Sequence, residues 1–237
     1  MGRKLCSGSI LLMDVLKDIQ PLPLFRKTDN QSISMYCMFA AMQRMEQINS
    51  LTTELERLSC NLVRGMAYPF GNYNDSVIEI INSLGIEYAR TVKDTYMFGI
   101  PNEFLKWHPT IHQFGKAYFT PDNPENDKKE LAGFYQVVNH FLKTDSLALL
   151  DVWGHSWENE GAGNRWTEME KFFKMVSMNP DIYYTTQIGL VDYINAFKNL
   201  KFTLDKSMVT NLSSINVFIK MKGKAFNIEA GSTRLLD

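Results

Sequence analysis

Three side chains in the segment LLDVWGHSWE, residues 149–158, have types and spacing that suit hydrolytic chemistry. Asp151, Trp153 and His155 are each two positions apart. Because alternate residues of a β-strand face the same side, a strand reaching residue 155 would present all three side chains on one face. There the carboxylate could keep the imidazole protonated and oriented, as a general acid requires, and the indole could stack on a sugar. The alternative is a histidine that only hydrogen-bonds a loop carbonyl at a strand end.

Other polar residues of the same region have weaker patterns. His108 and His112 have the H-x-x-x-H spacing of helical metal ligands, but Pro109 between them suits only the first turn of a helix, and no obvious third ligand accompanies them. Glu158 is either a hydrogen-bonding group at the rim of a site or a solvated loop carboxylate, and we favour the second interpretation. The sequence contains no G-x-S-x-G motif, phosphate-binding glycine loop or nucleotide-binding fingerprint.

Composition narrows the class of protein. The chain has 237 residues, 45% of them hydrophobic and 22% charged, which is enough for one sizeable core. A formal net charge of -1 provides no basic surface for nucleic acid, so we expect no nucleic-acid partner. We expect no membrane partner either, since no stretch approaches about 18–20 uninterrupted apolar residues. No signal peptide is recognised in the first residues, and the sequence therefore predicts a cytoplasmic protein.

From residue 62 onward, strand and helix patterns alternate. Residues 62–68 form an apolar run that ends at a proline, Asn74 can cap the helix that follows, Gly85 can end it, and residues 86–92 form the next strand. Further helices are predicted at 127–142, 166–178 and 188–197, further strands at 147–153 and 182–185, and short tail strands at 208–211, 215–221 and 225–230. This alternation favours an α/β fold with parallel strands.

Residues 1–61 do not follow this alternation. Residues 10–19 have the pattern of an amphipathic helix, and residues 34–58 are rich in methionine with a helical period. We therefore divide the chain into a divergent, mainly helical segment at 1–61 and a second domain at 62–237.

Two of these segments together resemble a known family. Residues 63–91, VRGMAYPFGNYNDSVIEIINSLGIEYART, and residues 149–158 are similar to motifs of the polysaccharide deacetylases, the NodB-homology group or carbohydrate esterase family 4. The resemblance extends over about residues 51–233. It implies an incomplete or distorted (β/α) barrel with short strands at its C-terminal end. Family members hold a divalent metal such as zinc with one aspartate and two histidines, but no such motif precedes Val63, so we expect no metal ligands and no cofactor here.

The resemblance also implies roles for individual residues. His155 matches the family histidine that donates a proton to the departing amine, with Asp151 as its suggested partner. The segment AYPFG at residues 67–71 resembles the family's R-x-P-Y-G segment, so the main chain at Phe70 is expected to help bind the oxyanion, although Ala67 takes the place of the arginine. A proline-punctuated turn with two core aromatic residues is the alternative for this segment. The expected substrate-binding side chains are Tyr68, Trp153, Trp157 and His112.

The function implied is hydrolysis of carbon–nitrogen, non-peptide bonds, with an acetyl group removed from an acetylated sugar or small molecule. A truncated, inactive family member that at most binds a glycan is the main alternative. A further hypothesis is that residues 1–50 arise from the reading frame or start site and replace a segment that carried the metal ligands.

Overall fold

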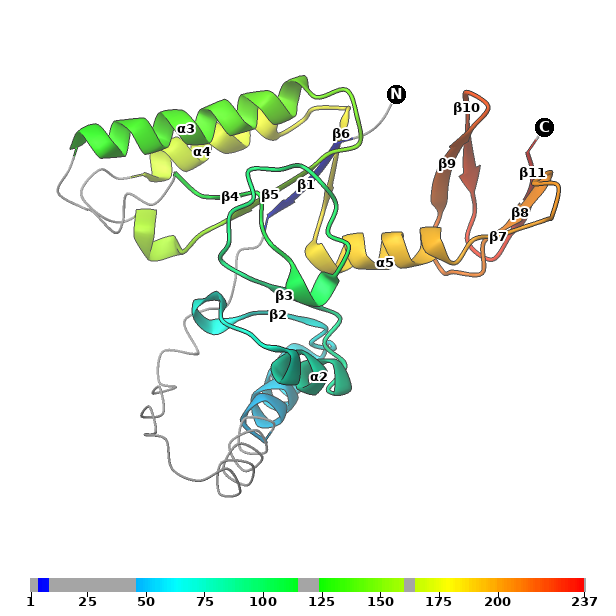
Figure 1. Cartoon of the computed structure of the whole chain (residues 1–237), viewed down its shortest axis with the longest axis horizontal. Helices are drawn as coiled ribbons and strands as arrows, with labels where there is room; N and C mark the ends of the chain where they lie inside the picture. The colour runs from blue at the N-terminus through cyan, green and yellow to red at the C-terminus, as the bar shows by residue number, and fades with distance from the viewer. Residues whose placement is uncertain (1–3, 9–45, 115–123, 160–164, 237) are drawn as a thin grey trace. The chain divides into compact units, whose positions relative to one another are not determined.

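The computed structural model describes residues 4–8, 46–114, 124–159 and 165–236 (Figure 1). The chain divides into two compact units, Met1–Thr185 and Thr186–Asp237, which we describe separately. The division of the chain into residues 1–61 and 62–237 was predicted from sequence patterns, and it stays a prediction.

A four-stranded sheet lies at the centre of the first unit. Its strands are β1 (Lys4–Gly8), β4 (Ile111–His112), β5 (Leu149–Trp153) and β6 (Ile182–Thr185), in the order β4-β5-β1-β6. All three pairings are parallel, as the alternation of strands and helices predicted. β1 lies in the segment that we expected to be mainly helical. A strand of a few residues has only a weak sequence pattern, so β1 is recognised by its pairing with neighbouring strands.

A second parallel pair precedes β4 in sequence. β2 (Gly65–Ala67) pairs with β3 (Tyr88–Arg90), and Arg90 forms a parallel bridge with Trp107, four residues before β4. The amide of Thr91 donates to the carbonyl of Trp107 at 2.8 Å. The pairings of the described residues neither close this run of strands into a barrel nor exclude closure, so the incomplete or distorted barrel stays a prediction.

Local signals place the helix between β2 and β3. In α2 (Asp75–Ser83) the side chain of Asn74 accepts a hydrogen bond from the amide of Val77 at 2.9 Å, which confirms the predicted cap. Gly85 follows the helix with φ +83°, a left-handed conformation that glycine adopts without steric cost.

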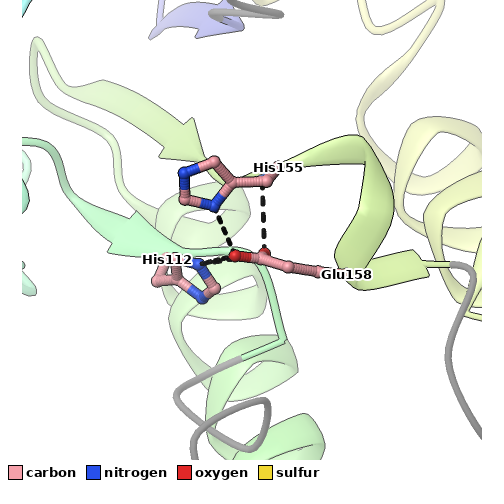
Figure 2. A group of neighbouring side chains, drawn as sticks. All are labelled: His112, His155 and Glu158. Carbon is pink, nitrogen blue, oxygen red and sulfur yellow. Dashed lines mark hydrogen bonds and ion pairs between the residues drawn. The ribbon is translucent and has the colours of Figure 1, made fainter. Parts of the chain in front are cut away.

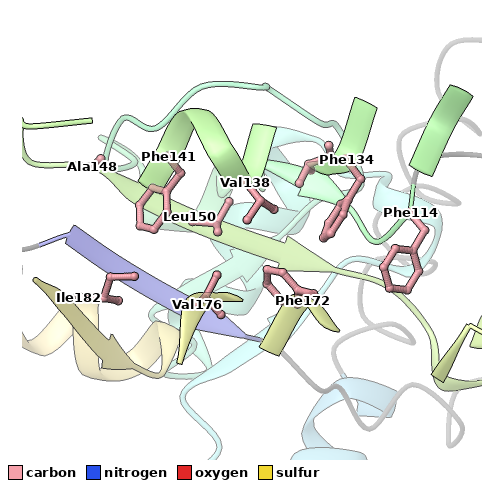
Figure 3. Close-up of a cluster of buried hydrophobic side chains, with 10 residues drawn as sticks. Phe114, Phe134, Val138, Phe141, Ala148, Leu150, Phe172, Val176 and Ile182 are labelled. Atoms are coloured by element: carbon pink, nitrogen blue, oxygen red, sulfur yellow. The ribbon is translucent and has the colours of Figure 1, made fainter. Parts of the chain in front are cut away.

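Two longer helices complete the core of the first unit. α3 (Pro124–Lys143) and α4 (Trp166–Val176) cover the predicted helices at 127–142 and 166–178. Phe134 of α3 contacts Phe172 of α4 with ring centroids 5.3 Å apart, and Leu150 of β5 belongs to the same cluster (Figure 3). The buried members of this cluster are Ile111, Phe114, Phe134, Val138, Phe141, Ala148, Leu150, Phe172, Val176 and Ile182.

Short elements complete the first unit. Its described residues include the 3₁₀ turns η2 (Pro69–Gly71), η3 (Phe104–Lys106) and η5 (Ser156–Asn159). Residues 46–59 are helical, and Ile48 packs against a small cluster that includes Tyr68 and Ile81. The helix predicted at 10–19 lies outside the described residues.

The second unit is an α+β module. It begins with α5 (Gln187–Lys198), whose N-cap Thr186 accepts from the amide of Gly189. Antiparallel strands follow in two small sheets, β11-β8-β7 and β10-β9. Their bounds are β7 (Lys201–Phe202), β8 (Met208–Thr210), β9 (Val217–Met221), β10 (Lys224–Ile228) and β11 (Thr233–Leu235). The short tail strands predicted from sequence are thus confirmed.

Within the described part of the chain, we find no helix with both the length and the apolar character that crossing a membrane requires.

Candidate functional site

The candidate site lies where two neighbouring parallel strands end. His112 is the last residue of β4, Trp153 is the last residue of β5, and the two are register partners. Their rings meet edge to face with centroids 4.5 Å apart. In sheets of this kind, ligands bind beyond the carboxyl ends of the strands, so this edge is where a site is expected.

The chain then turns back on itself and brings a carboxylate to the same place. After Gly154 and His155, the 3₁₀ turn η5 puts Glu158 beside both imidazoles (Figure 2). His155 Nδ1 is 2.5 Å from Glu158 Oε1, and His112 Nε2 is 3.0 Å from Glu158 Oε2. We call His112, His155 and Glu158 the His-Glu cluster. Their potential ligand atoms all lie within 4.8 Å of one another.

Gln113 holds the cluster in place. Its amide nitrogen donates to Glu158 Oε2 and to the carbonyl of His155, each at 2.8 Å. This amide lies against Gly154, where an added Cβ would be 2.2 Å from the Gln113 Cδ atom. A residue without a side chain is therefore needed at position 154 for Gln113 to reach the turn.

Two side chains of the cluster are buried, and the third is partly exposed to solvent. The side chains of His112 and Glu158 are 2% and 3% exposed, whereas that of His155 is 19% exposed. Burial by itself would raise the pKa of Glu158, but hydrogen bonds from His112, His155 and Gln113 outweigh it and lower the pKa to about 2. Glu158 is therefore a buried carboxylate that stays ionised at neutral pH, and our interpretation of it as a solvated loop residue is wrong.

A second polar network lies next to the cluster, around Trp153. The indole nitrogen of Trp153 donates to Asp94 Oδ1 at 2.7 Å, and the guanidinium carbon of Arg90 lies 4.7 Å from the centre of the indole ring. Only 6% of Trp153 is exposed. The ring that we expected to stack on a sugar is thus packed between protein groups in this structure and has little surface to offer a substrate.

Asp151 lies two residues before Trp153 on β5 and is buried. Burial lowers the pKa of Arg90, and the negative charges of Asp151 and Asp94 oppose that shift. The strand ends at Trp153, before His155, and the carboxylate bonded to His155 Nδ1 is Glu158. Glu158 is thus a carboxylate partner of His155 that the sequence did not predict, and the partnership predicted for Asp151 stays a prediction.

The turn at Phe70 follows β2 as His155 follows β5. Phe70 has φ 55°, a left-handed conformation uncommon for a residue with a side chain, and its ring is largely exposed. The amide of Gly71 donates to the carbonyl of Tyr68 at 2.9 Å, which closes the turn. The tight turn is confirmed, and the oxyanion-binding role of the Phe70 main chain stays a prediction.

The other expected substrate-binding residues have different placements. Tyr68 is 1% exposed, its hydroxyl donates to the carbonyl of Leu105 at 2.8 Å, and its ring stacks on Tyr73. These contacts are those of a core residue. The side chain of Trp157 lies outside what the structure describes.

The two histidines with H-x-x-x-H spacing do not share a site. His108 Nδ1 is 2.7 Å from the hydroxyl of Thr91, whereas His112 belongs to the His-Glu cluster. Sequence reasoning considered His112 and Glu158 separately and gave Gln113 no role. The signal it missed is the spacing from His155 to Glu158, because three residues of 3₁₀ helix bring two side chains to the same face.

Comparison with protein-family models, with curated proteins and with solved structures found nothing that matches this chain.

Proposed function

We propose that this chain is a hydrolase that cleaves carbon–nitrogen bonds and removes acetyl groups from the amide nitrogens of an acetylated sugar, with His155 as the acid. The observation that carries the proposal is the bond between His155 Nδ1 and the buried carboxylate of Glu158, at 2.5 Å. An acid that protonates a departing amine needs a fixed orientation and a charge that favours its protonated form. Glu158 fixes the orientation of the ring, and its carboxylate lies directly beside it.

The position of this pair supports the same role. Of the three cluster residues, His155 is the most exposed, so its ring is the one that a substrate could approach. In Figure 2 its second ring nitrogen lies on the side of the ring away from Glu158. Proton transfer to a leaving group from that nitrogen would leave the Nδ1 bond intact, as in histidine–carboxylate pairs in general.

The resemblance of two segments to the deacetylases supplies the substrate class. These segments are the turn at residues 67–71 and the strand end at residues 149–158. Both follow parallel strands, β2 and β5. The proposed oxyanion donor is the main chain at Phe70, whose left-handed conformation turns the backbone sharply at this point.

Release of acetate from N-acetylglucosamine oligosaccharides would test this function. We expect wild-type protein to release acetate and His155→Ala to lose about 10²- to 10⁴-fold in rate, the usual contribution of a positioned acid. His140→Ala is the matched control, because His140 lies on the exposed side of α3. Equal rates for wild type and His155→Ala would overturn the assignment of the acid. Absence of acetate release by the wild type would favour an inactive protein instead.

A further inference from the structure

The geometry points to a second capacity of the same residues: we propose that the His-Glu cluster binds one divalent transition-metal ion of the zinc class. This inference does not depend on deacetylation, since it concerns binding alone. It departs from the expectation, drawn from the sequence, that the chain has no metal ligands.

The chemistry of the donor set selects the ion. Two imidazole nitrogens and one carboxylate oxygen form a common set for Zn²⁺, Co²⁺ and related ions in sites that keep a position open. Mg²⁺ and Ca²⁺ prefer oxygen ligands. The cluster has two histidines and only one carboxylate, so we expect it to bind Mg²⁺ and Ca²⁺ weakly.

The distances from the Glu158 carboxylate to the two imidazoles are close to those of a metal site. Two atoms bound to one zinc ion at about 2.1 Å and a tetrahedral angle are about 3.4 Å apart. Measured to one oxygen, Glu158 Oε1, His112 Nε2 is 3.2 Å away and His155 Nδ1 is 2.5 Å away. Lengthening the distance from His155 Nδ1 to this oxygen by about 1 Å would bring both distances near the value for a bound ion. His155 can make this movement more easily than the other two, because it is the most exposed.

Surrounding groups fix the two buried ligands. Gln113 donates to Glu158 Oε2, and the ring of Trp153 packs against the imidazole of His112. Groups of this kind orient metal ligands, and their loss typically costs about 10- to 100-fold in affinity. The ligands also come from the end of β4 and from the turn after β5, which strand pairing holds in register.

Binding of an ion and action as an acid exclude each other at His155. The lone pair of Nδ1 would bond to the ion, so a proton carried on Nδ1 would have to leave to solvent. Zinc should therefore inhibit the proposed deacetylation. An increase in rate with zinc would overturn the role of His155 as an acid but leave the metal site standing.

Titration of the whole chain with Co²⁺ tests the site without any activity. A tetrahedral cobalt site gives visible absorption bands, and we expect these bands to grow to one equivalent and to disappear when Zn²⁺ is added. Mg²⁺ at the same concentration should not displace cobalt. His155→Ala and Glu158→Gln should each weaken cobalt binding by more than about 100-fold, since even outer-shell changes cost about 10- to 100-fold.

The other two histidines of the chain provide matched controls. His108→Ala and His140→Ala remove an imidazole without touching the His-Glu cluster and should bind cobalt as the wild type does. Circular dichroism shows which variants are folded, and His155→Ala, at the most exposed ligand, is the least disruptive of the ligand variants. The proposal fails if wild-type protein shows no cobalt bands, or if folded His155→Ala binds cobalt as tightly as the wild type.

Discussion

Each of the two units buries a polar side chain, but the neighbours of the two side chains differ. In the second unit Asn211 is completely buried. Its amide nitrogen donates to the carbonyls of Ile215 and Ile228 at 2.8 and 3.0 Å, and its amide oxygen accepts from the amide and the hydroxyl of Ser213. Four bonds, three of them to the backbone, satisfy an uncharged group.

Among the buried polar groups of the first unit, Glu158 is charged, and most of its partners are side chains. Glu158 contacts two histidines and one glutamine, each of which comes from a strand end or from the turn itself. A buried charge needs this number of partners, because burial without them would neutralise it.

The partners of a buried polar side chain indicate whether it has a structural or a chemical role. Asn211 holds one backbone arrangement and carries no titratable group, whereas the groups around Glu158 are those for which we propose proton transfer and metal binding. Buried polar groups that bond to the backbone are expected to contribute mainly to stability. Those that bond to other titratable side chains are candidates for function. The following predictions test this distinction, from the largest expected effect to the smallest.

Asn211→Ala should reduce stability most. It leaves two backbone carbonyls without their donor, and each buried unsatisfied group costs about 1–3 kcal/mol, so we expect a loss of about 4 kcal/mol. Urea unfolding followed by circular dichroism measures the loss. Asn195→Ala, at an exposed position of α5, should change the free energy of unfolding by less than about 0.5 kcal/mol. Weaker cobalt binding by folded Asn211→Ala would contradict the division of roles between the units.

Glu158→Gln should change how stability depends on pH. In the folded protein, the pKa of Glu158 is lowered from 4.5 to about 2. The ionised carboxylate therefore contributes stability that is fully present above about pH 4.5 and is lost as the pH falls toward 2. A shift of this size corresponds to on the order of 3 kcal/mol. The free energy of unfolding, measured with urea from pH 6 to pH 2, should fall more steeply for wild type than for Glu158→Gln. Parallel curves would show that Glu158 is not held by the histidines.

Gly154→Ala should disturb the site through Gln113. The new Cβ would lie 2.2 Å from Gln113 Cδ, so the Gln113 side chain must move and give up its bonds to Glu158 and to the His155 carbonyl. We expect a loss of about 1–3 kcal/mol and weaker cobalt binding. Gly133→Ala is the matched control, because Gly133 lies in α3 with open space around it. That change should stabilise the protein by about 0.5–1 kcal/mol. Equal stability of the two variants would mean that Gln113 does not depend on Gly154.

Tyr68→Phe should have the smallest effect. It removes the bond to the carbonyl of Leu105, at a cost of about 0.5–1.5 kcal/mol, and keeps the stacked ring. Because Tyr68 is a core residue in this structure, acetate release should keep the wild-type KM. A KM raised several-fold at unchanged stability would restore the substrate-binding role that the sequence suggested.

Short-range signals were the reliable part of the sequence analysis. The cap at Asn74, the glycine that follows α2, the tail strands and the turn at Phe70 depend on a few adjacent residues, and each is found where it was expected. The predicted helix ends differ from the observed ones by up to three residues; α3, for example, begins at Pro124 and was predicted to begin at residue 127. Strand β1 was missed because a strand of five residues gives too short a sequence pattern to recognise, and it depends on pairing with β5 and β6.

The candidate site shows the limit of this reasoning. The sequence itself determined that a histidine would follow an apolar strand, since hydrophobic pattern and turn residues act over a few positions. Only the tertiary structure decided which carboxylate that histidine meets, and that His112 joins it from 46 positions before Glu158. The reason is physical: the pairing of β4 with β5 sets which side chains meet at the ends of the strands, and this pairing is fixed by the packing of the whole core.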